Sequence, residues 1–180
     1  MELGLIHIYC GNGKGKTTAA MGLGMRAAGR SKKVLLTQFL KSNKTGELNS
    51  IEKLSEFFHV VKGAPAKKFV WNMNEEEKLE VKKEHTNRFR EVTKKAVEEG
   101  YDLLILDEII ATINRDFVML TEVIDFLNNK PTGLEVVMTG RNPKEELIEL
   151  ADYVSEIKAI KHPYNKGIKS RVGIEIWLYL

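Results

Sequence analysis

The chain has 180 residues and a mass of 20.5 kDa, which is the length of one domain and excludes a second full one. Its 28 basic and 25 acidic residues leave a net charge of +3, too small an excess to indicate a nucleic-acid-binding protein from charge alone. Hydrophobic residues make up 43% of the chain, enough to form a core. We therefore expect a single domain over residues 1–180.

Several features of the sequence predict a cytoplasmic protein. Cys10 is the only cysteine, so an internal disulfide is excluded, and the four histidines lack the spacing of a zinc site. No apolar run approaches the roughly eighteen residues that a membrane-spanning helix needs. Residues 1–9 also lack the basic start and the small-residue cleavage site of a signal peptide. We expect a reducing compartment and no membrane partner.

The first predicted elements enclose a glycine-rich loop. Residues 3–9 are apolar and β-rich, which predicts a buried strand. Residues 16–29 place alanine, leucine and methionine at helical spacing, and Gly29 stands where the helix ends. The loop between them reads Cys-Gly-Asn-Gly-Lys-Gly over residues 10–15. A strand, a glycine loop and a helix in this order are the context that a Walker A phosphate-binding loop requires.

Residues 11–18, Gly-Asn-Gly-Lys-Gly-Lys-Thr-Thr, have the chemistry of a Walker A loop as well as its context. The glycines let successive backbone N–H groups point inward, and the helix N-terminus adds its positive end. Lys16 supplies a mobile cation and Thr17 a hydroxyl for Mg²⁺. One position departs from the usual pattern, because Cys10 stands where a glycine is usual. The predicted nucleotide-binding residues of the loop are Gly11, Asn12, Gly13, Lys14, Gly15, Lys16, Thr17 and Thr18.

The middle of the chain alternates strands with helical segments. Residues 33–40 predict a second strand and residues 57–61 a weaker one, with a polar helical stretch through Glu47 and Leu54 between them. A long charged helix follows these elements.

This long helix is predicted to begin at Asn74 and to end at Gly100. Asn74 and Glu77 have the spacing of a capping box. Four apolar residues at helical spacing form its predicted buried side: Leu79, Phe89, Val92 and Ala96. The many glutamate and lysine residues between them are most simply its solvated face.

Residues 102–108, Asp-Leu-Leu-Ile-Leu-Asp-Glu, form an apolar run that ends in two carboxylates. The run suits a central parallel strand that is buried on both faces, and active sites of such sheets lie at the carboxyl ends of the strands. It fits a Walker B strand, in which Asp107 holds Mg²⁺ directly or through water and Glu108 faces the reacting group. We therefore predict bound ATP and a Mg²⁺ ion, or Mn²⁺ in its place, ligated by Thr17, Asp107 and Glu108.

The last part of the chain continues the alternation. A helix is predicted over residues 120–128, a strand over 134–139, a helix begun by Pro143, a strand near Val154 and a last strand over 173–179. Together with the two nucleotide motifs, this order predicts an α/β fold: a three-layer P-loop NTPase (RecA-like) domain with a mostly parallel central sheet.

Several segments in order resemble the P-loop type of ATP:cob(I)alamin (corrinoid) adenosyltransferases, and the resemblance covers most of the chain. The matching segments are residues 11–20, Gln38-Phe39, Phe69-Val-Trp71, Leu106-Asp-Glu108, Thr139-Gly-Arg141, residues 149–156, Lys161-His-Pro-Tyr164 with Gly167, and Gly173-Ile-Glu175. The resemblance implies transfer of the 5′-deoxyadenosyl group of ATP to the Co(I) of a reduced corrinoid, with release of triphosphate, in adenosylcobalamin biosynthesis or salvage.

The resemblance also implies roles for single residues. Cobalt(I) is already a strong nucleophile, so the protein must align it with C5′ of a reversed ATP and stabilise the leaving triphosphate. Arg141 is expected to add a phosphate contact. Phe69 and Trp71 are expected to cover the lower face of the corrin and displace its axial ligand, although ordinary core residues are the simpler interpretation without the resemblance. The expected catalytic residues are Lys16, Phe69, Trp71 and Glu108.

The family further suggests a homodimer and a flavoprotein that supplies the electron for reduction of the corrinoid. Longer members carry an N-terminal extension that folds across the active site, whereas ten residues precede Gly11 in this sequence. If such a cover is needed, another segment or subunit must provide it.

Two alternatives stay open. In a RecA-like P-loop ATPase, Glu108 would orient water against the γ-phosphate, and the products would be ADP and phosphate. The basic residues are dispersed and form no stripe with aromatic residues, so we expect no nucleic-acid partner. A carrier that binds ATP or a corrinoid without turnover is the other alternative, and the complete set of Lys16, Thr17 and Asp107 argues against it.

Overall fold

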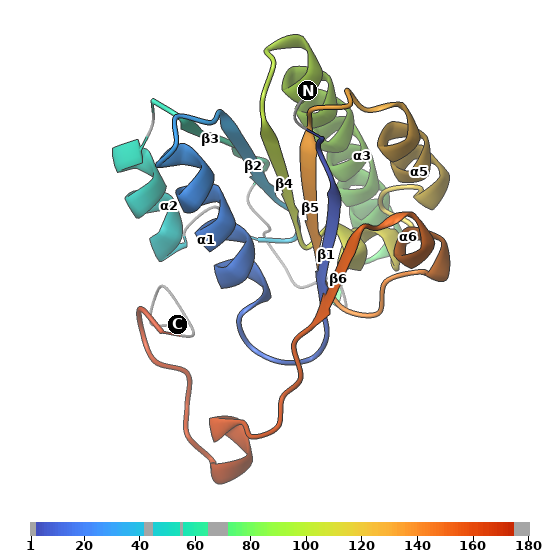
Figure 1. The fold of residues 1–180 in the computed structure, drawn as a ribbon. Coiled ribbons are helices and arrows are strands. Elements are labelled where there is room, and N and C mark those ends of the chain that lie inside the picture. The colour runs from blue at the N-terminus through green and yellow to red at the C-terminus, as the bar shows by residue number, and fades with distance from the viewer. Residues whose placement is uncertain (1–2, 42–44, 55, 65–71, 175–180) are drawn as a thin grey trace.

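A computed structural model describes residues 3–41, 45–54, 56–64 and 72–174. Within these ranges, six parallel strands form one sheet in the order β3-β2-β4-β5-β1-β6, with helices on both faces (Figure 1). The strands are β1 (Ile6–Cys10), β2 (Val34–Gln38), β3 (Phe58–Val61), β4 (Leu103–Asp107), β5 (Glu135–Thr139) and β6 (Tyr153–Glu156). The helices are α1 (Lys16–Ala28), α2 (Gly46–Ile51), α3 (Glu75–Glu98), α4 (Ile109–Ile113), α5 (Leu120–Asn129) and α6 (Glu145–Leu150), with 3₁₀ turns η1 (Glu52–Leu54) and η3 (Pro163–Lys166). The predicted three-layer α/β fold is confirmed.

The sheet separates two apolar cores, one under each layer of helices. On one face, α1 and α2 pack their Ala20, Met21 and Leu48 against alternate residues of β2, β3 and β4. On the other face, α3, α5 and α6 cover β1, β4 and β5, and Figure 1 shows these helices together on that side. All five residues of β2 and of β4 are buried, because both faces of these strands are covered.

The parallel arrangement brings the carboxyl ends of all six strands to one edge of the sheet. The register pairs Gln38 at the end of β2 with Asp107 at the end of β4, and Tyr9 of β1 with Thr139 at the end of β5. This edge is where open α/β sheets bind their ligands.

Strand β1 begins three residues later than predicted and includes Cys10. The reason lies in the partners of the preceding N–H groups. Leu5 donates its backbone N–H to the Glu135 carboxylate at 2.7 Å, and Ile6 donates to the Asp152 carboxylate at 2.8 Å. At the start of this strand, carboxylate side chains therefore accept backbone N–H groups that would otherwise bond to carbonyls of a neighbouring strand.

Helix α3 has the predicted capping box. Asn74 accepts the backbone N–H of Glu77 at 2.8 Å, and the Glu77 carboxylate accepts the N–H of Asn74 at 3.0 Å. Leu79 was wrongly placed on the buried side, because its side chain is 67% exposed. It lies in the first turns of α3, whereas the buried residues of this helix begin at His85.

Two further differences concern short elements. Helix α4 follows β4 directly and was not predicted, since five residues are too few to show a helical period. Gly173 and Ile174 form a turn, so the predicted strand over 173–179 does not begin there, and its residues 175–179 lie outside the described residues. Within the described ranges, no helix has the length and apolar character of a membrane span.

Candidate nucleotide site

The glycine loop follows β1 and is pressed against the chain that leaves β6. Gly13 donates its N–H to the carbonyl of Ile157 at 2.7 Å, and a Cβ on Gly11 would lie 2.4 Å from the same oxygen. Gly11 and Gly15 also have φ values of +102° and +124°, which disfavour any other residue. The loop residues are thus glycines because of close backbone approach and left-handed turns.

Cys10 stands before the loop, and its thiol belongs to the apolar core. Its backbone carbonyl accepts the N–H of Ile157 at 2.8 Å. Burial raises the pKa of the Cys10 thiol, and nearby Glu156 raises it further, so the thiol is no nucleophile. Cys10 is therefore a core residue whose backbone joins the strand before the loop to the chain that leaves β6.

Lys16 begins α1, and its side chain folds back over the loop. Its ammonium donates to the carbonyl of Gly13 at 2.8 Å, and the residue is only 8% exposed. Burial lowers the pKa of Lys16, Arg141 lowers it further, and Glu108 acts in the opposite direction. A phosphate beside this amine would hold it in the charged form.

Asp107 is the centre of the site and is fully buried. Its carboxylate accepts four hydrogen bonds from side chains: from Thr17 at 2.9 Å, Thr139 at 2.7 Å, Gln38 at 3.0 Å and Lys41 at 2.6 Å. Burial alone would raise the pKa of Asp107, but the charge of Lys41 and these hydrogen bonds lower it below the ordinary value. Asp107 is therefore ionised, as a metal ligand must be.

Glu108 has the opposite electrostatic environment. Burial raises its pKa, and the neighbouring Asp107 charge raises it further. Its backbone has φ +63°, and its N–H donates to the hydroxyl of Thr139 at 2.9 Å. A left-handed glutamate directly after a buried strand is uncommon, and such strained residues concentrate at functional sites.

Arg141 lies just beyond β5, on the same edge of the sheet. Its charge acts on both Lys16 and Glu108, so the structure brings it to the site. Asn114 donates to the carbonyls of Arg141 and Asn142, each at 3.0 Å, and thereby fixes the backbone of this turn. The other predicted pair, Phe69 and Trp71, lies outside the described residues.

Three donors to Asp107 had no expected role from the sequence: Gln38, Lys41 and Thr139. Gln38 ends β2 and Thr139 ends β5, the two strands that flank β4 in the sheet. Because parallel strands end at one edge, their polar character at that position was a usable signal. Lys41 lies three residues beyond the end of β2 and had no comparable signal.

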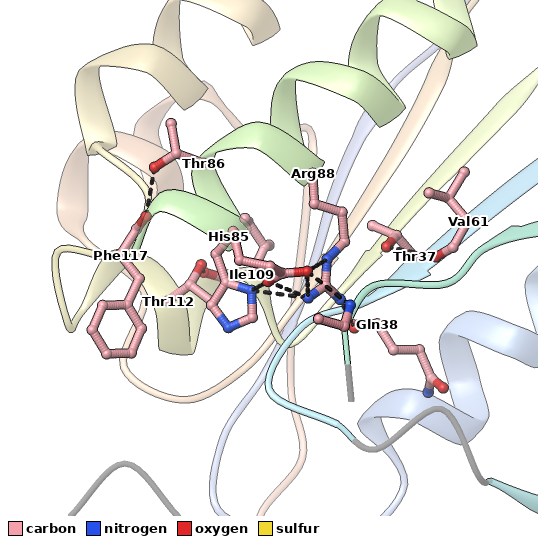
Figure 2. A network of polar contacts seen from close by, with 11 residues as sticks. Thr37, Gln38, Val61, His85, Thr86, Arg88, Ile109, Thr112 and Phe117 are labelled. Carbon is pink, nitrogen blue, oxygen red and sulfur yellow. Dashed lines mark hydrogen bonds and ion pairs between the residues drawn. The ribbon is translucent and has the colours of Figure 1, made fainter. Parts of the chain in front are cut away.

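A buried ionic cluster on α3 supports this edge from behind. Arg88 donates to the carbonyl of Gln38 at 2.6 Å and to the Glu84 carboxylate at 2.9 Å, and Figure 2 shows the guanidinium between α3 and the end of β2. His85 lies 2.6 Å from the same carboxylate. Arg88 is 3% exposed and the Glu84 side chain 27%, so the prediction that the glutamates of this helix form a solvated face is wrong for Glu84.

The Glu84 carboxylate stays ionised in this cluster. Burial acts to raise its pKa, but hydrogen bonds from His85 and Arg88 outweigh burial and lower the pKa to about 2. Gly63 leaves space for the guanidinium, because a Cβ there would lie 1.9 Å from Cζ of Arg88. The cluster fixes the carbonyl of Gln38, whose side chain in turn holds Asp107.

The residues around Asp107 fit Mg²⁺ by their chemistry. Thr17 contributes a hydroxyl and Asp107 an ionised carboxylate, and their oxygens are 2.9 Å apart. Mg²⁺ prefers such hard oxygen donors and commonly combines one or two carboxylates with substrate phosphates. The loop next to Thr17 supplies the backbone N–H groups for those phosphates.

Comparisons with known proteins identify the family to which this chain is similar. The family model described as ATP:corrinoid adenosyltransferase BtuR/CobO/CobP matches residues 2–176. A corrinoid adenosyltransferase of Escherichia coli strain K12 is 37% identical over 179 residues, covering 97% of this chain and 86% of that protein. The corrinoid adenosyltransferase CobA of Salmonella typhimurium is 35% identical over 179 residues, with the same coverage of both chains.

A solved structure shares the fold at much lower sequence similarity. A KaiC-like protein of Pyrococcus horikoshii superimposes with a TM-score of 0.54 and 16% identity, covering 87% of this chain and 72% of that one. At this identity the likeness concerns the arrangement of strands and helices alone.

Proposed function

This chain belongs to the ATP:corrinoid adenosyltransferase family, and we propose that it transfers the 5′-deoxyadenosyl group of ATP to the Co(I) of a reduced corrinoid, with release of triphosphate. The observation that carries the proposal is the joint position of the phosphate loop and the buried carboxylate. Thr17, from the loop, and Asp107, from β4, share a hydrogen bond of 2.9 Å at the edge where ligands of such sheets bind.

The proposed reaction is a displacement at carbon. The cobalt lone pair forms the Co–C5′ bond, the C5′–O bond breaks, and its electron pair leaves with the triphosphate. Cobalt is oxidised from Co(I) to Co(III), and no proton needs to be removed. The protein therefore has to align the reactants and stabilise the charge of the leaving group.

The residues of the site suit the second task. The loop N–H groups and Lys16 would bind the triphosphate oxygens, and Arg141, whose charge acts on Glu108, would add a further contact. Thr17 and Asp107 would hold Mg²⁺, which offsets negative charge on the leaving triphosphate when it is bound. Glu108 is the third candidate ligand, and its raised pKa makes it the weaker of the two carboxylates.

The first task requires C5′ to face the corrinoid. Binding of ATP in reversed direction along the loop, as the resemblance implies, meets this requirement. Phe69 and Trp71 are proposed to cover the lower face of the corrin, so that cobalt loses its axial ligand and Co(II) becomes easier to reduce. A flavoprotein is the proposed electron donor, because flavins deliver single electrons.

We further propose that the protein is a homodimer. All four residues of β6 are exposed, and β6 is an edge of the sheet. Proteins commonly cover such an edge by pairing or packing. The cytoplasmic location stays a prediction from the sequence.

An anaerobic assay with MgATP and chemically reduced cob(I)alamin tests the proposal. We expect a light-sensitive cobalt–carbon chromophore and one equivalent of intact triphosphate on chromatography. ADP and phosphate with an unchanged corrin spectrum would instead indicate the ATPase alternative. Binding of either substrate without any product would indicate the carrier.

A further inference from the structure

Lys41 places its ammonium between the two groups assigned to the metal. Its Nζ donates to Asp107 Oδ2 at 2.6 Å and to Thr17 Oγ1 at 3.0 Å. Thr17 and Asp107 are also bound directly to each other. An ammonium in contact with both groups uses the same oxygen atoms that a Mg²⁺ ion would use.

The backbone before Lys41 is specifically shaped for this contact. Leu40 has φ +56°, a conformation that bulky residues seldom adopt. The N–H of Phe39 donates to the carbonyl of Asp107 at 2.9 Å and joins the start of this turn to the end of β4. The Lys41 side chain is only 25% exposed. A strained and partly buried arrangement of this kind is typical of functional positions.

The charges of the site favour an exchange of cations. Lys41, Lys16 and Arg141 all act on the Glu108 carboxylate, so three cations surround two carboxylates. A divalent ion bound to Asp107 and Thr17 would lie within a few ångströms of the Lys41 ammonium and repel it. Lysine has a flexible stem and strong hydration, so its ammonium moves readily to another anion.

We infer that Lys41 and Mg²⁺ compete for Asp107 and Thr17, and that the Lys41 ammonium moves to the triphosphate when metal-bound ATP arrives. Lys41 is then a further triphosphate-binding residue of the reaction. This inference rests on the proposed binding of MgATP at the loop. It predicts that Mg²⁺ changes the affinity for ATP by a factor that depends on the Lys41 side chain.

The test compares ATP affinity with Mg²⁺ and with EDTA, by calorimetry, in the wild type and in Lys41→Met. Without metal, loss of the ammonium leaves Asp107 uncompensated beside the phosphates, so ATP affinity falls strongly. With Mg²⁺, the variant loses the contact of Lys41 with the triphosphate, but Mg²⁺ no longer competes with an ammonium for Asp107 and Thr17. ATP affinity therefore falls less than it does without metal. We expect the enhancement of ATP affinity by Mg²⁺ to rise by about tenfold or more in Lys41→Met.

Two variants serve as controls. Lys41→Arg keeps a cation and keeps the enhancement within about threefold of the wild type. Lys94→Met removes an exposed cation of α3 that pairs with Glu98, and it leaves both affinities unchanged. Thermal melting of each variant establishes that it is folded before the titrations.

The outcomes separate this inference from the proposed function. An equal change in affinity under both conditions, or none under either, would overturn the competition while leaving the transferase intact. The Mg²⁺ enhancement of ATP affinity could be larger in Lys41→Met than in the wild type although neither protein forms adenosylcobalamin. That result would support the competition and contradict the proposed function. A wild type that binds no ATP under either condition would overturn both.

Discussion

Thr17 and Asp107 are 90 positions apart in the sequence, and their side chains meet in a hydrogen bond of 2.9 Å. Thr17 comes from the first turn of α1, and Asp107 ends the fully buried strand β4. The parallel sheet brings the two together because Asp107 ends β4 and Thr17 follows the loop that leaves the carboxyl end of β1, at the same edge of the sheet. The pair joins the phosphate loop to a carboxylate that remains ionised despite complete burial.

Removal of the Thr17 hydroxyl is expected to abolish most activity. Thr17→Ala takes away one proposed metal ligand and one donor to Asp107, so kcat/KM for MgATP falls by about a hundredfold or more. Thr17→Ser keeps the hydroxyl and retains most of the activity. The adenosylation assay, with thermal melting as the measure of folding, checks both variants. Equal loss in the two variants would show that the methyl group, not the hydroxyl, matters.

Acidification is expected to weaken the ionic cluster behind the site. The pKa of Glu84 is about 2 in the folded protein, below the ordinary value of roughly 4.3 for an unfolded chain. The ionised carboxylate therefore contributes stability that is present above roughly pH 4.3 and is lost as the pH falls through about 2. Urea unfolding of the wild type and of Glu84→Gln measures this contribution.

The two proteins should differ most near neutral pH. Glu84→Gln leaves the buried Arg88 without its charged partner at every pH, whereas the wild type loses that partner only in acid. The difference in unfolding free energy should therefore shrink between pH 6 and pH 3. A difference that stays constant over this range would show that the charge of Glu84 is not what stabilises the cluster.

Most of the fold and the centre of the site are predictable from local sequence signals. The glycine loop, the capping box of Asn74 and the apolar run ending in Asp107 each identify an element from neighbouring residues alone. The cluster around Arg88 has no such signal, because its partners come from α3, β2 and the chain after β3. A helix face rich in glutamate and lysine looks solvated until the tertiary contacts are known.

Lys41 shows the same limit within the site. Its identity as a lysine is visible in the sequence, but its contact with Asp107 depends on the left-handed turn at Leu40. Such a conformation in a residue other than glycine, asparagine or aspartate is not readable from the chain. Gln38, in contrast, is a polar residue at the end of a buried strand, which is the same signal that identifies Asp107.

Trp71 is expected to act on the corrinoid and not on the nucleotide. Trp71→Ala should leave MgATP affinity within about threefold of the wild type, because the aromatic ring is proposed to face the macrocycle. The four-coordinate form of the Co(II) corrinoid, measured by electron paramagnetic resonance, should form slowly in this variant or not at a detectable level. Adenosylation of chemically prepared Co(I) corrinoid should fall less than adenosylation from Co(II). Unchanged rates from Co(II) under a mild reductant would contradict this role.

The position of the Arg88 guanidinium leaves no space for a side chain at Gly63, so substitution of Gly63 is expected to disturb it. In Gly63→Ala the new Cβ would lie 1.9 Å from Cζ of Arg88, so either the guanidinium or the backbone must move. Overpacking of this kind costs about 1–3 kcal/mol, and here it also disturbs the hydrogen bond to the Gln38 carbonyl. We expect a lower melting temperature and, through Gln38 and Asp107, a higher KM for MgATP.

The matched control is Gly22→Ala on α1. A Cβ at Gly22 meets no atom within 4 Å, and alanine is the better helix former, so this variant should be as stable as the wild type or more stable by about 0.5–1 kcal/mol. Urea unfolding and steady-state adenosylation of both variants separate the two effects of Gly63→Ala. A destabilised Gly63→Ala with an unchanged KM would limit the cluster to a structural role. Restoration of the KM by the double variant Gly63→Ala/Arg88→Lys would identify the guanidinium as the group that the new methyl displaces, since lysine lacks the planar fork that fills this space.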